Sequence, residues 1–409
     1  MKDRAKTGPE IRAPRKSGWN ALLALASAAL FAQGCTVLND RNPLPEDYKN
    51  QASVLGTSDY RFWGDELSTI GDTLPENPTM EQLQAALPGL VRQELNILAI
   101  SGGGENGAFA AGLLNGWTEA GTRPEFNIVT GVSTGALIAP FAFLGPAYDH
   151  FLEQIYTQYS TKDLIKQRGR IRSLRTDAIF DTKGLRSLIA EFADEELMAA
   201  IAEEHRRGRY LLIGTTNLDA ARPTTWNIGA IASSGKPGAL QLIRDVLLAS
   251  ASIPIVFPPV IIEVEANGQT YDELHTDGGV SRQSFLFDLS ADENSFEGLQ
   301  IIGTGRAFLI MNSKLEPAWE TVDRRIFDIA GRSASSMVRS QGLGDLYREF
   351  LAARKFGIDF NLAYIPSEFE ADNHELFDQN YMRSLYKLGY EMGVEGYSWR
   401  NAPPGIELP

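Results

Sequence analysis

The chain has 409 residues, of which 43% are hydrophobic, so it is long enough and apolar enough to fold around a substantial core. Its formal net charge is −14 at pH 7. Nucleic-acid binding requires a basic surface against the phosphates, and this acidic balance argues against a nucleic acid as partner. A single cysteine excludes an intrachain disulfide, so stability has to come from core packing.

The N-terminus is basic and then apolar. Residues 1–20 hold six Lys or Arg against two Asp or Glu, and an apolar run of 11 residues follows from Ala21 to Phe31. A membrane span needs about 20 apolar residues, so this run is too short to be one. A basic stretch, a short apolar run and then small residues are typical of a secretory signal.

Cys35 ends the stretch Ala32-Gln33-Gly34-Cys35, which resembles a bacterial lipobox except that Ala32 stands where Leu is usual. The resemblance implies cleavage before Cys35 and lipidation of that residue, so residues 1–34 are expected to be a lipoprotein signal peptide. An ordinary signal peptide with a chance cysteine is the alternative. Cleavage would take the net charge from −14 to −18 by removing six positive and two negative charges. Thr36 follows the cysteine, and by analogy with proteobacterial sorting this predicts the outer membrane.

Residues 35–75 are predicted to be a tether and lead-in, because they are rich in Asn, Asp, Pro and Gly without a sustained period. Apolar residues then recur at helical spacing, which predicts an amphipathic helix over about 79–92. No second compact domain is indicated, so residues 76–409 are expected to form one domain.

Strand-like and helix-like segments alternate from residue 95 onward. Short apolar runs predict strands over 95–100, 127–130, 210–213 and 307–311, and helical periodicity predicts helices over 109–117, from 136 onward, through 240–248 and over about 319–355. Asn267-Gly268 separates two further strand-like runs and is the dipeptide best suited to a tight hairpin turn. The alternation predicts an α/β fold with three layers, α/β/α, around a mostly parallel central sheet.

Two glycine-rich motifs follow predicted strands. Gly131-Val132-Ser133-Thr134-Gly135 lies between a strand and a helix, where a sharp turn can expose a nucleophilic serine hydroxyl. Three consecutive glycines, Gly102, Gly103 and Gly104, follow the first strand, and their N–H groups could stabilise the oxyanion of acyl transfer. Gly102, Gly104 and Gly107 also fit a dinucleotide fingerprint, but that site needs an acidic residue after the second strand, where the serine motif stands instead.

A third motif, Asp277-Gly278-Gly279, closes the predicted hairpin. Taken alone, Asp-Gly-Gly is most often only a turn. The three motifs, however, appear in order and each at a predicted strand end, which is where active sites form in such sheets.

Together the three motifs resemble the patatin-like phospholipase family, with its glycine-rich oxyanion loop, G-x-S-x-G and D-G-[GA]. The stretch from Ala249 to Pro254 and the residues from Asn217 to Asp219 are also similar. The resemblance implies a patatin-like fold. It also implies Ser133 as nucleophile, Asp277 as its partner in a Ser-Asp dyad, and Gly102, Gly103 and Gly104 as the oxyanion loop. Ser101 and Asn106 depart from the family, which often has Asp at the first position and usually Arg or Lys at the second.

The implied activity is hydrolysis of a fatty acyl ester, in a phospholipid or other lipid, through an acyl-enzyme. No cofactor is implied, and no metal site is expected, since no His, Cys or carboxylate cluster has ligand spacing. The expected partners are the lipid substrate and, through Cys35, the membrane; the oligomeric state stays open. Two alternatives remain: a tethered scaffold of this fold with little activity, and a Ser-His-Asp esterase, for which only His374 follows Asp277 in the chain.

Overall fold

The computed structural model describes residues 41–66, 94–164, 166–167, 178–286, 304–317, 319–370 and 375–407. Residues 43–409 form one of two compact units, and the fold below is that of its described part. The predicted signal peptide, Cys35, the helix expected over 79–92 and His374 all lie outside the described residues. Within the described ranges, no helix is both long and apolar enough to cross a bilayer.

A nine-stranded sheet runs through this unit in the order β1-β7-β6-β3-β2-β10-β11, and the hairpin β8-β9 joins it at β6. Its strands are β1 (Arg61–Trp63), β2 (Glu94–Ile100), β3 (Ile128–Val132), β6 (Tyr210–Asn217), β7 (Arg222–Asn227), β8 (Val260–Ala266), β9 (Gln269–Asp277), β10 (Thr304–Met311) and β11 (Ile358–Tyr364). β6, β3, β2, β10 and β11 are parallel neighbours, whereas the pairings of β1, β7, β8 and β9 are antiparallel. A separate two-stranded sheet pairs β4 (Lys166–Gln167) with β5 (Phe180–Asp181).

The described α-helices are α3 (Gly107–Glu119), α4 (Thr134–Leu144), α5 (Asp149–Gln158), α6 (Thr161–Leu164), α8 (Lys183–Phe192), α9 (Glu195–Arg206), α10 (Ile228–Ser233), α11 (Ala239–Ser250), α13 (Ile326–Lys355) and α14 (Gln379–Val394). Strands and helices alternate along the chain as the sequence predicts. The prediction of an α/β fold with a mostly parallel central sheet is therefore confirmed.

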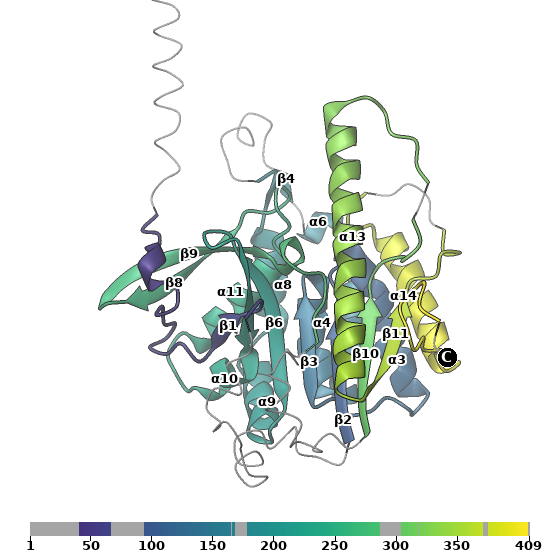
Figure 1. Cartoon of the computed structure of the whole chain (residues 1–409), viewed down its shortest axis with the longest axis horizontal. Helices are drawn as coiled ribbons and strands as arrows, with labels where there is room; N and C mark the ends of the chain where they lie inside the picture. Colours follow the sequence, from purple (N-terminus) through teal and green to yellow (C-terminus); the bar gives the residue numbers. More distant parts are fainter. Residues whose placement is uncertain are drawn as a thin grey trace, which may run out of the picture. The chain divides into compact units, whose positions relative to one another are not determined.

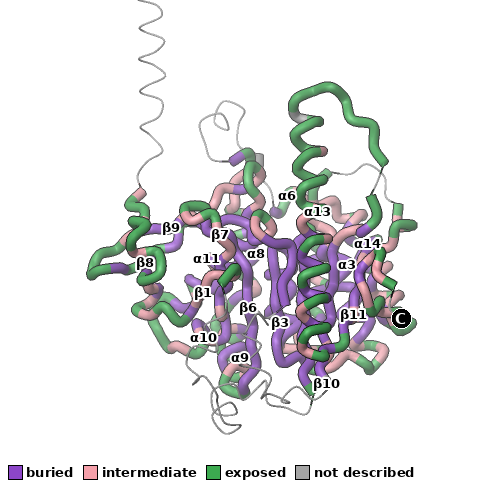
Figure 2. Tube along the Cα trace, viewed as in Figure 1, coloured by how far each residue is buried: buried purple, intermediate pink, exposed green. Residues whose placement is uncertain are grey.

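The two faces of the sheet bury two different cores. Leu98, Ile100 and Val129 face a large core that they share with helices including α3, α4, α11 and α14. Leu95 and Ile97 point to the other face, where α13 covers the sheet. Side chains alternate along a strand, and β2, β3 and β6 are apolar on both faces because helices cover both. Figure 2 shows these strands as buried and the first half of α13 as exposed.

Glycines allow α3 and α14 to pack closely. A side chain at Gly112 of α3 would bring its Cβ to 2.0 Å from the backbone oxygen of Tyr386 in α14. A side chain at Gly389 of α14 would likewise bring its Cβ to 2.3 Å from the oxygen of Phe109. This packing anchors α3, which follows the glycine loop directly.

Part of the predicted lead-in lies on the sheet. Leu44 N–H donates to the oxygen of Asp272 at 3.0 Å, and β1 adds an antiparallel strand beside β7. Residues 43–66 are thus tied to the domain, whereas residues 67–75 lie outside the described part. Two other bounds differ slightly from expectation: β3 continues to Val132, directly before Ser133, and α13 begins at Ile326 rather than near residue 319.

Candidate active site

Ser133 lies in the turn between β3 and α4. Its φ of 54° and ψ of −123° place it in a sparsely populated region, which typically costs about 1–3 kcal/mol and is common at functional sites. The flanking glycines allow the turn to be this tight: a Cβ at Gly135 would lie 2.2 Å from the oxygen of Ile100, and one at Gly131 would lie 2.4 Å from that of Gly135. Both glycines of the motif are therefore required by close backbone approach.

Asp277 meets Ser133 although 144 residues separate them. Val132 pairs with Gly214 of β6, and the next residue of β6, Thr215, pairs with Asp277. This register brings the end of β9 beside the serine turn. Ser133 Oγ donates to Asp277 Oδ2 at 2.6 Å, and each residue is only 5% exposed. The structure therefore brings together the two residues that the sequence selects as nucleophile and base.

The environment of Asp277 favours proton transfer near neutral pH. Burial raises the pKa of Asp277 to about 7, against the opposing effect of hydrogen bonds donated by Ser133 and by the Gly279 N–H. The latter bond, to Asp277 Oδ1, is 2.7 Å long and fixes the carboxylate plane. A general base works best when its pKa lies near the operating pH, and a carboxyl of ordinary pKa would be a much weaker acceptor.

The end of α11 holds both partners in place. Ser250 Oγ accepts a hydrogen bond from the Ser133 N–H at 3.0 Å and donates to the oxygen of Gly214 at 2.6 Å. The carbonyl of Ser252 accepts from the Asp277 N–H at 3.0 Å and from the hydroxyl of Thr276 at 2.7 Å. Family resemblance pointed to this stretch without giving it a role, and its role is to fix the serine turn against the aspartate strand.

The three glycines after β2 differ in what their N–H groups do. Gly102 N–H donates to the oxygen of Gln283 at 3.0 Å, so it cannot also stabilise an oxyanion while that bond persists. The N–H groups of Gly103 and Gly104 donate to no acceptor within the described part of the chain. Gly104 also lines the cavity that contains Ser133. Of the predicted oxyanion loop, Gly103 and Gly104 therefore keep N–H groups that are available to an oxyanion, whereas the Gly102 N–H ties the loop to Gln283.

Ser101 and Asn312 support this loop through buried hydrogen bonds. Asn312 N–H donates to Ser101 Oγ at 2.8 Å, its side-chain amide donates to the oxygen of Ser101 at 2.9 Å, and Ser101 Oγ donates to the oxygen of Gly102 at 2.7 Å. Both residues are buried. The Ser101 hydroxyl is thus part of the support of the loop, and Asn312 belongs to the site although no sequence motif identifies it.

Asn106 has a partner of its own. The hydroxyl of Tyr381 in α14 donates to Asn106 Oδ1 at 2.6 Å, and burial raises the pKa of Tyr381 to about 12, so the phenol stays a donor. The Asn106 N–H donates to the oxygen of Gly103 at 3.1 Å. At the position where the family usually has a cation, this chain has a hydrogen-bonded amide that links the glycine loop to α14.

Gln283 connects three parts of the site. Its side-chain amide donates to the oxygen of Gly279 at 2.7 Å, its carbonyl accepts from Gly102, and its N–H donates to Asp345 Oδ2 of α13 at 2.6 Å. The Asp-Gly-Gly turn, the glycine loop and α13 thereby share one anchor. Nothing in the local sequence around Gln283 indicates this role, because it arises only from tertiary contacts.

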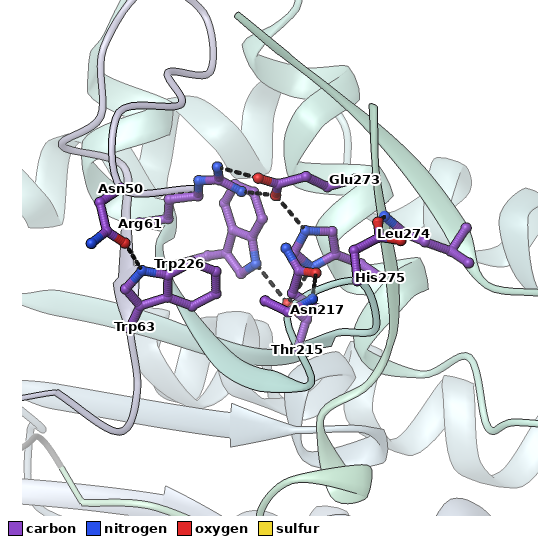
Figure 3. A network of polar contacts seen from close by, with 11 residues as sticks. Asn50, Arg61, Trp63, Thr215, Asn217, Trp226, Glu273, Leu274 and His275 are labelled. Carbon is purple, nitrogen blue, oxygen red and sulfur yellow. Dashed lines mark hydrogen bonds and ion pairs between the residues drawn. The ribbon is translucent and has the colours of Figure 1, made fainter. Parts of the chain in front are cut away.

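The described histidines do not contact the dyad. His275 is fully buried, and its ring bonds to Glu273 Oε2 at 3.1 Å and to Thr215 Oγ1 at 3.0 Å, as Figure 3 shows. The Glu273 carboxylate can only accept, so Nε2–H donates to it, and Nδ1 of the neutral ring then accepts from the Thr215 hydroxyl, which itself accepts from the Trp226 indole. Burial lowers the pKa of His275 and keeps it neutral. His150 and His205 bond to the carbonyls of Ala147 and Arg209, far from this chemistry.

A narrow apolar cavity of about 40 Å³ opens beside the Ser133 side chain. Its wall is built from α4, α5, α6, α8, α14 and the segments after α11 and before α14, and includes Leu137, Ile155, Leu185, Leu188, Ile253 and Phe257. Its one phenol, Tyr156, is bonded to the hydroxyl and carbonyl of Thr134. In the described part of the chain, no group of His, Cys, Asp or Glu has the arrangement of a metal site. The site therefore combines a serine hydroxyl that is hydrogen-bonded to a buried carboxylate with an adjacent apolar cavity.

The segment that contains this site also matches a known protein family. Residues 98–288 match the model of the family described as patatin-like phospholipase, and this range holds the glycine loop, Ser133 and Asp277. No curated protein sequence matches the chain. Among solved structures, it is similar to VipD from Legionella pneumophila at 12% identity and a TM-score of 0.35, over 74% of this chain and 66% of that one. The chain thus spans just under two thirds of that protein, and so distant a likeness adds nothing to the family match.

Proposed function

We propose that Ser133 and Asp277 hydrolyse fatty acyl esters as a catalytic dyad, because residues 98–288 match the model of the patatin-like phospholipase family. The observation that carries this proposal is the 2.6 Å hydrogen bond from Ser133 Oγ to a buried carboxylate whose pKa lies near 7. A serine hydroxyl needs such an adjacent base to become a nucleophile.

The proposed reaction has two halves. Asp277 takes the proton of Ser133 as its oxygen attacks the ester carbonyl, and the N–H groups of Gly103 and Gly104 stabilise the oxyanion. The ester C–O bond breaks, the leaving alcohol receives the proton from Asp277, and the acyl group stays on Ser133. Water then attacks the acyl-enzyme, Asp277 accepts a proton from it, and the fatty acid leaves as Ser133 recovers its hydrogen.

The apolar cavity beside Ser133 supports a fatty acyl chain as the part of the substrate that the enzyme holds. Burial of hydrocarbon contributes about 0.8 kcal/mol per methylene, whereas a polar acyl group would lose its hydration against this wall. The head group and the acyl position that is cleaved follow from neither the motif nor the cavity, so we propose a phospholipid or another acyl-ester lipid as substrate class.

A lipid anchor at Cys35 is the second part of the proposal. The lipobox-like stretch supports it, and Thr36 supports sorting to the outer membrane of a bacterial envelope. An anchor at the membrane surface would hold the active site beside its substrate and raise the effective substrate concentration.

Labelling with a fluorophosphonate, read by intact mass, tests the catalytic proposal. The wild-type chain should gain one phosphonyl group, Ser133→Ala should gain none, and Asp277→Asn should react at least about a hundredfold more slowly because an amide cannot accept the proton. His374→Ala should label like wild type. An unreactive His374→Ala beside a reactive Asp277→Asn would instead identify a conventional triad, and an unreactive wild type would identify a scaffold.

A further inference from the structure

A second apolar cavity lies next to the one beside Ser133. It measures about 30 Å³ and is lined by residues of α4, α5, α8, α9 and α11 and by Ala193, which follows α8; among the others are Pro140, Phe141, Ile189, Phe192 and Leu247. Three residues, Leu137, Ile155 and Leu188, line both cavities. The two spaces are therefore neighbours that share a wall, and that wall consists of three apolar side chains.

The two cavities follow the axes of two helices. Along α4, Ser133 and Leu137 line the first cavity, and Leu137 and Phe141 line the second. From Ser133 to Phe141 the helix rises by about 12 Å at 1.5 Å per residue. On α8, Leu185, Leu188 and Phe192 recur at helical spacing, so one face of that helix lines the path from the serine to its far end.

The path has the chemistry of a hydrocarbon site. Among the described residues that line the two cavities, none carries a charge, and the second cavity has only apolar side chains. Apolar cavities of this kind stay free of water, although each exceeds the roughly 10–15 Å³ that a water molecule needs. Filling such space with methylenes gains dispersion contacts without displacing bound water.

We propose that the substrate's acyl chain runs from Ser133 past Leu137, Ile155 and Leu188 into the second cavity, so that these side chains set which chain lengths the enzyme accepts. The proposal rests on the proposed acyl hydrolysis at Ser133. The first cavity takes the carbons next to the ester, and the second takes the distal end of a longer chain. Phe141 and Phe192, whose rings meet edge to face at 6.4 Å between centroids, close the far end.

The test compares kcat/KM for p-nitrophenyl esters from butyrate to palmitate in the full chain. Ala193→Leu places a larger side chain in the second cavity alone and should leave butyrate hydrolysis near wild type. Each buried methylene is worth about fourfold in kcat/KM, so displacing two or three should lower the rate on long chains by about 15- to 60-fold. Leu188→Ala shortens a side chain of the shared wall and leaves more space between the two cavities. It should therefore raise the ratio of long-chain to butyrate hydrolysis by a similar factor.

Ala190→Leu is the matched control, because Ala190 lies on α8 outside both cavities and is only half-buried. Circular dichroism and melting temperature confirm that each variant folds, and alkylphosphonates of graded length, which label Ser133 in one step, repeat the comparison without turnover. An unchanged chain-length profile in both Ala193→Leu and Leu188→Ala would overturn the proposal. A wild type that cleaves no ester and takes no phosphonate would overturn the proposed function instead.

Discussion

Burial has two opposing effects on Asp277: it makes the carboxylate a stronger base for its proposed role, and it also favours the protonated form, which cannot act as a base. Only the ionised carboxylate can accept the proton of Ser133. Its pKa of about 7 therefore places the protonation step inside the pH range in which a cell works.

We predict that kcat/KM on a short-chain ester rises about tenfold per pH unit below pH 7 and levels off above it. Protonation of Asp277 removes the base, so activity is lost as the pH falls through about 7. The measurement is a pH-rate profile between pH 5 and 9, with melting temperature recorded at each pH to exclude unfolding. A profile that stays flat down to pH 5 would show that a group of ordinary carboxyl pKa, or none, limits the rate.

At the scale of single residues, the sequence predicted the two side chains that the structure joins by a hydrogen bond, but only part of their support. Ser133 and Asp277 stand in local motifs whose glycines are required by backbone geometry, so the motifs are visible in one stretch of chain. Ser250, Asn312 and Gln283 act through contacts that only the folded chain creates. The same limit applies to Gly102, since its N–H is taken by a carbonyl 181 residues further along the chain.

At the scale of elements, the parallel strands and the hairpin were predictable because their signals are local. β2, β3 and β6 are buried on both faces and therefore read as unbroken apolar runs. Asn267 and Gly268, with φ of 48° and 73°, form the turn that the dipeptide favours. β1 was not predictable, because a strand of three half-buried residues has neither length nor a clear period, and its place depends on β7.

Arg61 is the residue through which β1 is tied to the buried network of Figure 3. Its guanidinium donates to Glu273 through both nitrogens, the longer bond being 2.8 Å, and the side chains are 8% and 2% exposed. Despite the cost of burial, hydrogen bonds from His275 and Arg61 lower the pKa of Glu273 to about 2. The carboxylate is thus charged, buried and dependent on its partners.

We predict that Arg61→Met lowers the free energy of unfolding by about 3–5 kcal/mol, because it leaves a buried charge without its partner. Urea unfolding at pH 7 is the measurement. Arg222→Met is the matched control, since Arg222 pairs with the more exposed Asp65 and such a pair is worth about 1 kcal/mol or less. Equal losses of stability in the two variants would show that the buried Arg61–Glu273 pair contributes no more than the exposed Arg222–Asp65 pair. The double variant Arg61→Met/Glu273→Gln should recover part of the stability that Arg61→Met loses, because it no longer holds an unpaired buried charge.

At the scale of the whole molecule, the proposed anchor at Cys35 should decide where the enzyme works. We predict that Cys35→Ser moves the protein from the membrane fraction to the soluble fraction, because one lipidated residue carries the attachment. Fractionation after a high-salt wash, with metabolic palmitate labelling of wild type, measures this. Retention of Cys35→Ser in the washed membranes would contradict the lipoprotein proposal while leaving the catalytic one intact.

Stability should also depend on pH through groups far from each other in the fold. Folding lowers the pKa values of Glu273 and His275. Each group therefore adds to the free energy of unfolding at a pH above its pKa in the unfolded chain, and this stabilisation is lost as the pH falls through the pKa in the folded protein. Glu349 on α13 acts in the opposite direction. Its burial, together with the charge of Asp345, raises its pKa to about 8, so the native state holds a proton that the unfolded chain releases near pH 4.5.

For a carboxyl whose folded pKa is raised, the stability that protonation contributes is complete below the unfolded pKa and is lost as the pH rises through the folded one. We therefore predict that the wild type loses stability between pH 5 and 9 and that Glu349→Gln loses less, by on the order of several kcal/mol. At pH 5 the two should be equally stable, because the protonated acid and the amide are both neutral. Urea unfolding across this range measures the difference, and Glu395→Gln, at an exposed position beyond α14, is the control. Parallel stability curves for wild type and Glu349→Gln would mean that Glu349 is already ionised in the folded protein. In that case the charge must be balanced by Arg282 and Arg348, the cations whose charges act on Glu349.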